Sequence, residues 1–166
     1  MDLDRLSAGE KIAGVSAVVL FAFMFLDWFG VKVSGQGGST TLPGGGSAWD
    51  SLDFIPIVLV VTIVIALINV AIRLGDSAQD PPVPLNTAVA VLGVISCLLI
   101  LFRIIDPPSF GEISGLSVDG TLELGIFLSL LAAAGIAIGG YLGMQEERES
   151  FGDAADHFSS GPPGQP

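Results

Sequence analysis

Four long apolar stretches constrain this chain more than any other feature of its sequence. A helix needs about 20 mostly apolar residues to cross the hydrocarbon core of a bilayer. Four segments meet this requirement: residues 12–31, 54–72, 85–105 and 122–144. Asp27, Arg103 and Glu123 are the only charged residues inside them. The sequence therefore predicts an all-α fold, in which four transmembrane helices form a bundle.

The overall composition agrees with a membrane protein. Hydrophobic residues make up 51% of the chain and charged residues only 14%, whereas a soluble domain has about 25% charged residues. The formal net charge of −11 disfavours nucleic acid as a partner, because binding to phosphates requires clustered positive charge. A membrane β-barrel is disfavoured as well, since its strands alternate polar and apolar residues.

Local signals at the ends of the spans predict where the helices begin. Ser7 and Glu10 have the spacing of a capping box, so the first helix should begin before the bilayer core. Pro56 falls in the expected first turn of the second helix, where a missing N–H costs little. Asn86 and Thr121 are the predicted caps of the third and fourth helices.

The distribution of positive charge predicts the orientation in the membrane. Basic residues near span ends favour the cytoplasmic side. One side holds Arg5, Lys11, Arg73 and Arg148, and the other holds Lys32 and Arg103. This balance predicts that both termini lie on the cytoplasmic side of a cell membrane. Residues 32–53 and 106–121 are then external loops, and residues 76–84 form a cytoplasmic linker.

The loops and the C-terminal tail have different expected roles. The first external loop is rich in glycine, and Trp49 near its end is predicted to anchor it at the membrane interface, as are Trp28 and Phe29. We divide the chain into a membrane domain, residues 1–145, and a tail, residues 146–166. The tail is acidic and then rich in Gly, Pro and Ser, so we predict that it is disordered.

The fourth span carries a stripe of small residues. Gly135, Gly139 and Gly143 are four residues apart and line one helix face. Small residues let helix backbones approach closely in lipid. Packing within the chain's own bundle is the favoured interpretation, with Gly93 and Cys97 of the third span as the receiving groove. A homo-oligomer or a membrane protein partner is the alternative.

Four charged residues fall at one predicted membrane level and form a candidate external cluster: Asp27, Arg103, Asp106 and Glu123. Charged residues within spans are functional candidates by default. Glu123 and Arg103 also complement the dipoles of their helix ends. Asp27 does not, so it needs water or a cationic partner. We hypothesise an ion pair between Asp27 and Arg103, with simple hydration of Asp27 as the alternative.

The residues needed for most catalytic chemistry are missing from the sequence. Cys97 is the only cysteine and His157 the only histidine, so neither an internal disulfide nor an ordinary zinc site can form. None of the common nucleotide-binding, hydrolase or metalloprotease motifs is present. We therefore expect no catalytic residue, no cofactor and no metal, and we expect that the chain is not an enzyme.

The segments Leu26-Asp27-Trp28-Phe29-Gly30 and Phe102-Arg103-Ile104-Ile105-Asp106-Pro107-Pro108 carry a resemblance. With the glycine-rich loop and the glycine-lined fourth span, the chain resembles the small four-span membrane proteins common in actinobacterial genomes. The resemblance implies a bacterial cell membrane. We expect a non-enzymatic accessory or envelope interaction protein. A small transporter or channel component, with the charged cluster as its vestibule, is the alternative.

Overall fold

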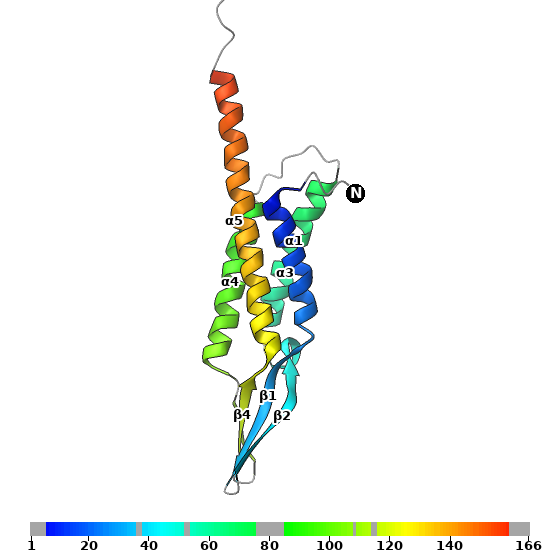
Figure 1. Cartoon of the computed structure of the whole chain (residues 1–166), viewed down its shortest axis with the longest axis vertical. Helices are drawn as coiled ribbons and strands as arrows, with labels where there is room; N and C mark the ends of the chain where they lie inside the picture. The colour runs from blue at the N-terminus through cyan, green and yellow to red at the C-terminus, as the bar shows by residue number, and fades with distance from the viewer. Residues whose placement is uncertain are drawn as a thin grey trace, which may run out of the picture.

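The computed structural model describes residues 6–35, 38–51, 54–75, 85–107, 109–113 and 116–159. Four long helices lie side by side: α1 (Ala8–Phe23), α3 (Ile55–Leu74), α4 (Leu85–Ile105) and α5 (Leu124–Ser159). A small sheet projects from one end of this bundle (Figure 1). Its strands are β1 (Asp27–Gly35), β2 (Gly38–Ser47), β3 (Ser109–Ile113) and β4 (Leu116–Leu122). The short helix α2 (Ala48–Ser51) joins β2 to the segment before α3.

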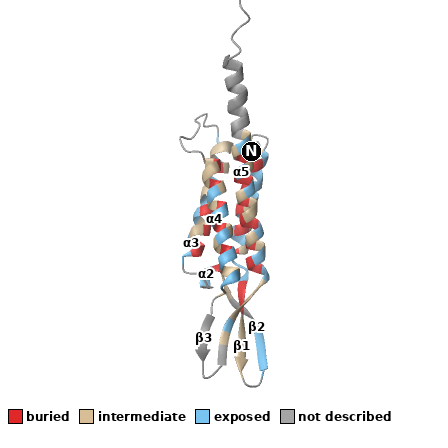
Figure 2. Cartoon of the chain, turned by 90° about the vertical axis from the view of Figure 1, so that its left-hand side faces the viewer, coloured by how far each residue is buried: buried red, intermediate tan, exposed pale blue. Residues whose placement is uncertain are grey.

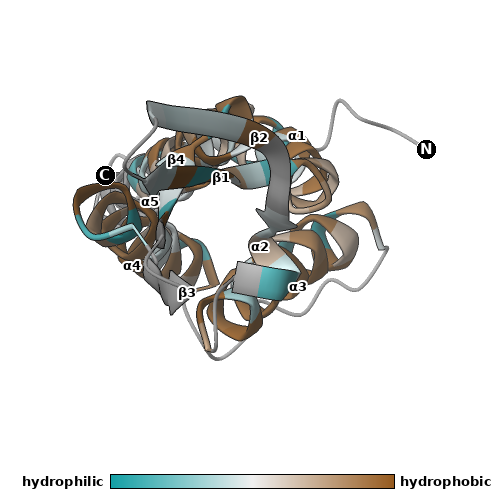
Figure 3. Cartoon of the chain, turned by 90° about the horizontal axis from the view of Figure 1, so that it is seen from below, coloured by the Kyte–Doolittle hydropathy of each residue, from teal (hydrophilic) through white to brown (hydrophobic). Residues whose placement is uncertain are grey.

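The four long helices form a ring. Helix α1 packs against α3 and α5, and α4 packs against the same two helices. Helices α1 and α4 therefore face each other diagonally, as the view along the bundle shows (Figure 3). Three helical segments are long and apolar enough to cross a membrane: Ile55–Leu74, Leu85–Ile105 and Leu124–Glu146. Helix α1 has 16 residues, which corresponds to about 24 Å.

The predicted end of the first span is wrong. Helix α1 ends at Phe23, and β1 begins at Asp27, so the last residues of the predicted 12–31 span form a strand. The indole N–H of Trp28 donates to the carbonyl of Phe23 at 3.0 Å. This bond satisfies one of the carbonyl groups that every helix end leaves free. A continuous apolar run does not reveal such a change, because hydropathy alone cannot separate helix from strand.

The predicted external loops contain strands, so the fold is not purely α-helical. The sheet is antiparallel in the order β2-β1-β4-β3. Its central pair runs from Phe29 opposite Leu122 to Ser34 opposite Ser117. Valines alternate with Lys32 and Ser34 in β1, which is the period of a strand. Pro43 and the glycines of β2 are tolerated because β2 is an edge strand.

The helix starts follow the predictions in two of four cases. Ser7 and Glu10 form the expected capping box at α1, and Pro56 lies in the first turn of α3. Asn86 does not cap its helix, because α4 begins at Leu85 and the Asn86 side chain is buried. Thr121 does not cap α5 either, because it belongs to β4 and the helix begins at Leu124.

Helix α5 continues well past the predicted end of the last span at residue 144. It runs to Ser159, so residues 146–159 of the predicted disordered tail are helical in this structure. The long α5 extends beyond the bundle at the end opposite the sheet (Figure 1). The rest of the predicted tail, residues 160–166, and the predicted linker, residues 76–84, lie outside the described residues.

Polar and apolar side chains are distributed as in a membrane protein. Large apolar side chains cover the outside of the bundle, among them Val15 at 66% exposure and Leu131 at 70%. Buried residues occur on all four helices over the length of the bundle (Figure 2). The interior contains small and apolar side chains together with a set of buried polar ones: Glu10, Thr62, Asn69, Asn86, Ser96 and Ser129. Such an apolar exterior matches the hydrocarbon core of a bilayer.

Candidate functional site

The junction between bundle and sheet is where the predicted external residues come together. Helix α1 leads into β1, and β4 leads into α5, so the helix pair α1–α5 continues as the strand pair β1–β4. The backbone N–H of Glu123 donates to the carbonyl of Trp28 at 2.9 Å, directly where the two pairs meet. A Cβ on Gly125 would lie 2.5 Å from the Asp27 carbonyl oxygen. The sheet is thus tied closely to the bundle.

Trp28 and Phe29 form the core of this junction. Both side chains are fully buried, so their predicted role as membrane-interface anchors is wrong. Hydropathy and position could not distinguish a buried aromatic pair from an exposed one. The interface role fits Trp49, which is 44% exposed. Its ring lies 5.9 Å from that of Phe25, and the Phe25 ring lies 5.3 Å from that of Phe21.

The cap of α2 holds Trp49 in place. Asp50 Oδ2 accepts hydrogen bonds from the Ser47 hydroxyl at 2.7 Å and from the Ser47 backbone N–H at 3.1 Å. These two bonds stabilise the carboxylate, so the pKa of Asp50 lies below its ordinary value. The Ser47 hydroxyl in turn accepts the N–H of Trp49 at 3.3 Å. Ser47 and Asp50 thus bond each other's end of the first turn and fix the start of a helix of only four residues.

The four residues of the candidate charged cluster lie at the sheet end of the bundle, but the structure separates them into two places. Asp27 is exposed at the first residue of β1, and Glu123 is partly buried between β4 and α5. Arg103 and Asp106 lie at the end of α4, where the Arg103 Nη1 donates to the Asp106 carbonyl at 3.4 Å. Within the described parts of the chain, no ion pair joins Asp27 to Arg103. That predicted pair is wrong.

Glu123 has a different neighbour, Gly30 of β1. A Cβ on Gly30 would lie 2.6 Å from Glu123 Oε1 and 2.7 Å from Thr121 Oγ1. Both side chains therefore fold over the bare backbone of Gly30. The Thr121 hydroxyl is buried without a hydrogen-bond partner. This contact is a packing role for Glu123 that neither span position nor helix-dipole reasoning indicates.

The glycines of the predicted face on the last span lie against other helices of the bundle. A Cβ on Gly139 would lie 2.5 Å from the Ala13 amide nitrogen and 2.6 Å from the Gly9 carbonyl oxygen. Gly135 lies against the Ser16 side chain, and Gly143 contacts Gly9. Helix α1 therefore receives Gly135 and Gly139, whereas a Cβ on Gly143 would lie 3.0 Å from the Asn86 side chain of α4. Gly9, Ala13 and Ala17 are spaced four apart, a signal that was present in the sequence and was missed.

Helix α4 packs on a second face of α5. A Cβ on Gly93 would lie 2.6 Å from the Ala137 amide nitrogen, and one on Gly140 would lie 2.5 Å from the Ala90 amide nitrogen. Gly93 therefore packs against Ala137 of α5 and not against the predicted stripe of Gly135, Gly139 and Gly143. Cys97 is partly buried next to the core. Helix α5 is in close backbone contact with two neighbours at once.

Helices α3 and α4 are joined by hydrogen bonds between buried side chains. Asn69 Nδ2 donates to Asn86 Oδ1 at 2.7 Å, and the hydroxyls of Thr62 and Ser96 lie 3.0 Å apart. The side-chain NH2 group of Asn86 is buried and has no hydrogen-bond partner. These pairs connect helices in lipid, where few other polar groups compete. Sequence position shows that the residues are polar and intramembrane, but it does not pair them.

An ion pair joins α1 to α3 at the end opposite the sheet. Arg73 Nε lies 3.0 Å from Glu10 Oε1, and the Glu10 side chain is only 4% exposed. Glu10 Oε2 also accepts the Ser7 N–H at 3.0 Å as part of the capping box. One carboxylate therefore both caps α1 and holds α3. The pairing was not predicted, although both residues lie on the same predicted membrane side.

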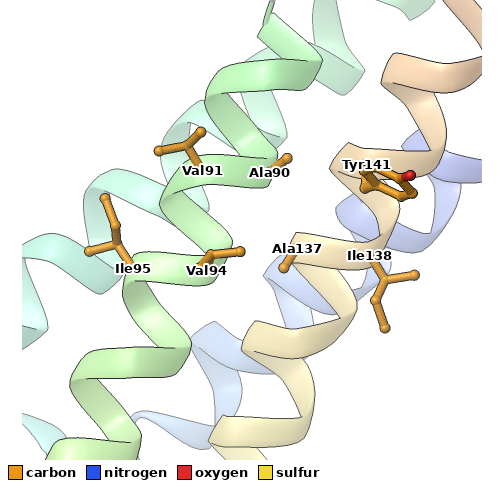
Figure 4. A pocket seen from close by; sticks show the side chains of 7 residues that line it. All are labelled: Ala90, Val91, Val94, Ile95, Ala137, Ile138 and Tyr141. Carbon is orange, nitrogen blue, oxygen red and sulfur yellow. The ribbon is translucent and has the colours of Figure 1, made fainter.

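Two grooves open on the outside of the bundle. One, of about 470 Å³, lies between α4 and α5, and its lining is apolar except for the Tyr141 hydroxyl (Figure 4). The other, of about 680 Å³, lies between α1 and α3 and includes Glu10 and Lys11. Among the residues that the structure describes, no group of three His, Cys, Asp or Glu side chains could hold a metal ion.

Comparisons with known protein families, with curated proteins and with solved structures give no match for this chain.

Proposed function

We propose that this chain is a four-span protein of a bacterial cell membrane that acts without catalysis, as an accessory or envelope protein that docks a protein partner through its sheet. The observation that carries this proposal is the direct continuation of α1 and α5 into β1 and β4. A loop would leave the external segments free to move. A strand pair that continues a helix pair instead presents a fixed surface beyond the end of the bundle (Figure 1).

The exposed edge of the sheet supports a docking role. Strand β2 is an edge strand, and Thr40, Thr41 and Leu42 on it are exposed. An edge strand offers unpaired backbone N–H and C=O groups, which can pair with a strand of another chain. The partner is either another membrane or envelope protein or a second copy of this chain.

Besides the three helices of membrane length, we propose α1 as a fourth span. At about 24 Å it is shorter than the hydrocarbon core of about 30 Å. It packs against α5, which has a segment of membrane length, and its outward side chains Val15 and Val18 are exposed and apolar. The turn at residues 24–26 extends the apolar surface with Phe25 and Leu26. With four spans, both termini lie on one side, which we propose is the cytoplasm.

Photocrosslinking in native membranes tests the docking role. A photoreactive phenylalanine analogue at Thr41 is expected to give a discrete protein adduct, because Thr41 lies on the exposed edge strand. The same analogue at Leu131, which is 70% exposed on α5, is the control and should crosslink to lipid. Adducts of twice the chain mass would identify a second copy as the partner. If Thr41 and Leu131 gave only lipid adducts, the docking role would be wrong.

Cysteine labelling tests the topology. Cys97→Ser removes the only natural thiol. In that background, Ser39→Cys in β2 should react with a membrane-impermeant maleimide on intact cells, because β2 is proposed to be external. Gln145→Cys, exposed near the end of the membrane-length part of α5, should react only after the cells are opened. Equal labelling of both positions on intact cells would contradict the four-span topology.

The second candidate is a small transporter or channel component. It is favoured by the buried polar side chains within the ring, namely the pairs Thr62–Ser96 and Asn69–Asn86. The charged residues at the sheet end would serve as its vestibule. Ion flux into proteoliposomes that contain only this chain, abolished by Arg103→Gln, would favour this candidate over the docking role.

A further inference from the structure

The groove between α1 and α3 combines an apolar trough with a charged end. Val15, Val18, Leu67 and Val70 line its apolar part. Its volume of about 680 Å³ falls within the range of about 300–1,000 Å³ that is typical of small-molecule sites. Val15 and Val18 are 66% and 57% exposed, so the trough opens toward the surroundings of the bundle. In a membrane those surroundings are acyl chains.

Among the described residues that line the charged end of the groove, one cation makes no ion pair. Glu10 is already engaged, because its two oxygens accept Arg73 Nε and the Ser7 N–H. Lys11 is exposed beside it and, in the described ranges of the chain, makes no ion pair. The Glu10 charge is offset by Arg73, so among the described residues that line the groove Lys11 is the one whose charge is not offset by an ion pair.

The spacing between these two parts fits an amphipathic molecule with a negative head. Lys11 and Val18 are seven residues apart on one helix, which is about 10 Å along the membrane normal. A lysine stem can lie along apolar surface while its ammonium reaches the headgroup level. An acyl chain would lie against the valines while a phosphate would meet the ammonium.

We propose that this groove binds one anionic phospholipid, with an acyl chain along α1 and α3 and its phosphate at Lys11. The groove between α4 and α5 is the natural comparison, because its lining contains no charged residue (Figure 4). That groove should accept acyl chains without regard to the headgroup. A single lysine near a negative lipid surface contributes about a fivefold preference.

Native mass spectrometry of the delipidated full chain in detergent tests the proposal. Phosphatidylglycerol and phosphatidylcholine with identical acyl chains are added at equal concentration. The natural chain should retain one phosphatidylglycerol with about a fivefold preference. Lys11→Gln should remove the preference, and Lys11→Arg should keep it. Val18→Trp should fill the trough and prevent retention, whereas Val91→Trp in the other groove should leave the preference unchanged.

Several results would overturn the proposal. Equal retention of the two lipids by the natural chain would do so, and so would an unchanged preference in Lys11→Gln. Loss of the preference in Val91→Trp would place the lipid site in the groove between α4 and α5 instead. Full displacement of the lipid by inorganic phosphate would show that the phosphate alone is recognised and that the trough takes no part. Lys11, Val18 and Val91 are all exposed, and unchanged thermal unfolding of the variants excludes a folding defect.

Discussion

The α1–α5 interface and the α3–α4 interface hold helices together by different means. In the first, Gly139 and Gly9 bring the two helix backbones into direct contact. In the second, side chains bridge the helices through the pairs Asn69–Asn86 and Thr62–Ser96. Since lipid removes the hydrophobic drive between helices, close packing and interhelical hydrogen bonds are the contacts that the chain itself can supply. The pair that continues into the sheet uses close packing.

The largest expected effect is at the close-packed interface. Gly139→Leu places a side chain where even a Cβ would lie 2.5 Å from the Ala13 backbone. Because backbone atoms cannot move aside, we expect a loss of at least about 3 kcal/mol in the free energy of unfolding. Thermal unfolding in detergent, followed by circular dichroism, measures the loss. Leu131→Phe on the exposed face of α5 is the control and should change little.

The hydrogen-bonded interface should respond less and in a different way. Asn69→Leu leaves Asn86 Oδ1 buried without its donor, which should cost about 1–2 kcal/mol. Replacing both residues with leucine removes the unsatisfied group, so the double variant should unfold at a higher temperature than the single variant. If the two single effects simply added, the pair would not be coupled. Additive losses would weaken the contrast between the two interfaces.

The junction with the sheet should be less sensitive to added volume than the close-packed interface. Gly30→Ala places a methyl group close to Glu123 Oε1 and Thr121 Oγ1. These are side-chain atoms, and Glu123 can rotate, so we expect a loss of about 1 kcal/mol. Glu123→Ala in the same chain should recover part of it. Equal losses for Gly30→Ala and Gly139→Ala would show that the junction is as rigid as the helix interface.

The smallest effect concerns the cap of α2, outside both interfaces. Its hydrogen bonds lower the pKa of Asp50, so their contribution to stability is complete above the unfolded-state pKa. The contribution is lost as the pH falls through the lower folded-state pKa, below about pH 4. Trp49 fluorescence should change in that range. Asp50→Asn should lack the transition, and a transition that persists in that variant would belong to another group.

The sequence reveals the membrane helices better than it reveals their partners. Three spans agree closely with α3, α4 and the apolar part of α5, because long uncharged runs have few other solutions. The run that begins at residue 12 misleads, since its apolar content continues from α1 through Trp28 and Phe29 into β1. Hydropathy cannot mark that change, and only the alternation in β1 signals a strand.

The candidate site shows the same limit. The sequence assigns the charged residues to one level of the bundle, but their contacts depend on side-chain geometry. Asp27 is exposed, and Glu123 lies over Gly30. The Glu10–Arg73 pair depends on the neighbouring positions of α1 and α3, which spacing along one helix does not specify. The four-residue spacing of the glycine face is a property of one helix, so the sequence shows it, whereas the helices that the face contacts depend on the fold.

The pairing of β1 with β4 also has a consequence for biosynthesis. The two central strands come from opposite ends of the chain and are separated by α3 and α4. During synthesis β1 can pair with β2 early, whereas β4 emerges only just before α5. The β1–β4 pair and the α1–α5 contact can therefore form only after β4 and α5 have been synthesised. Pairings this distant along the chain are slow to form, so these two contacts should complete the fold last.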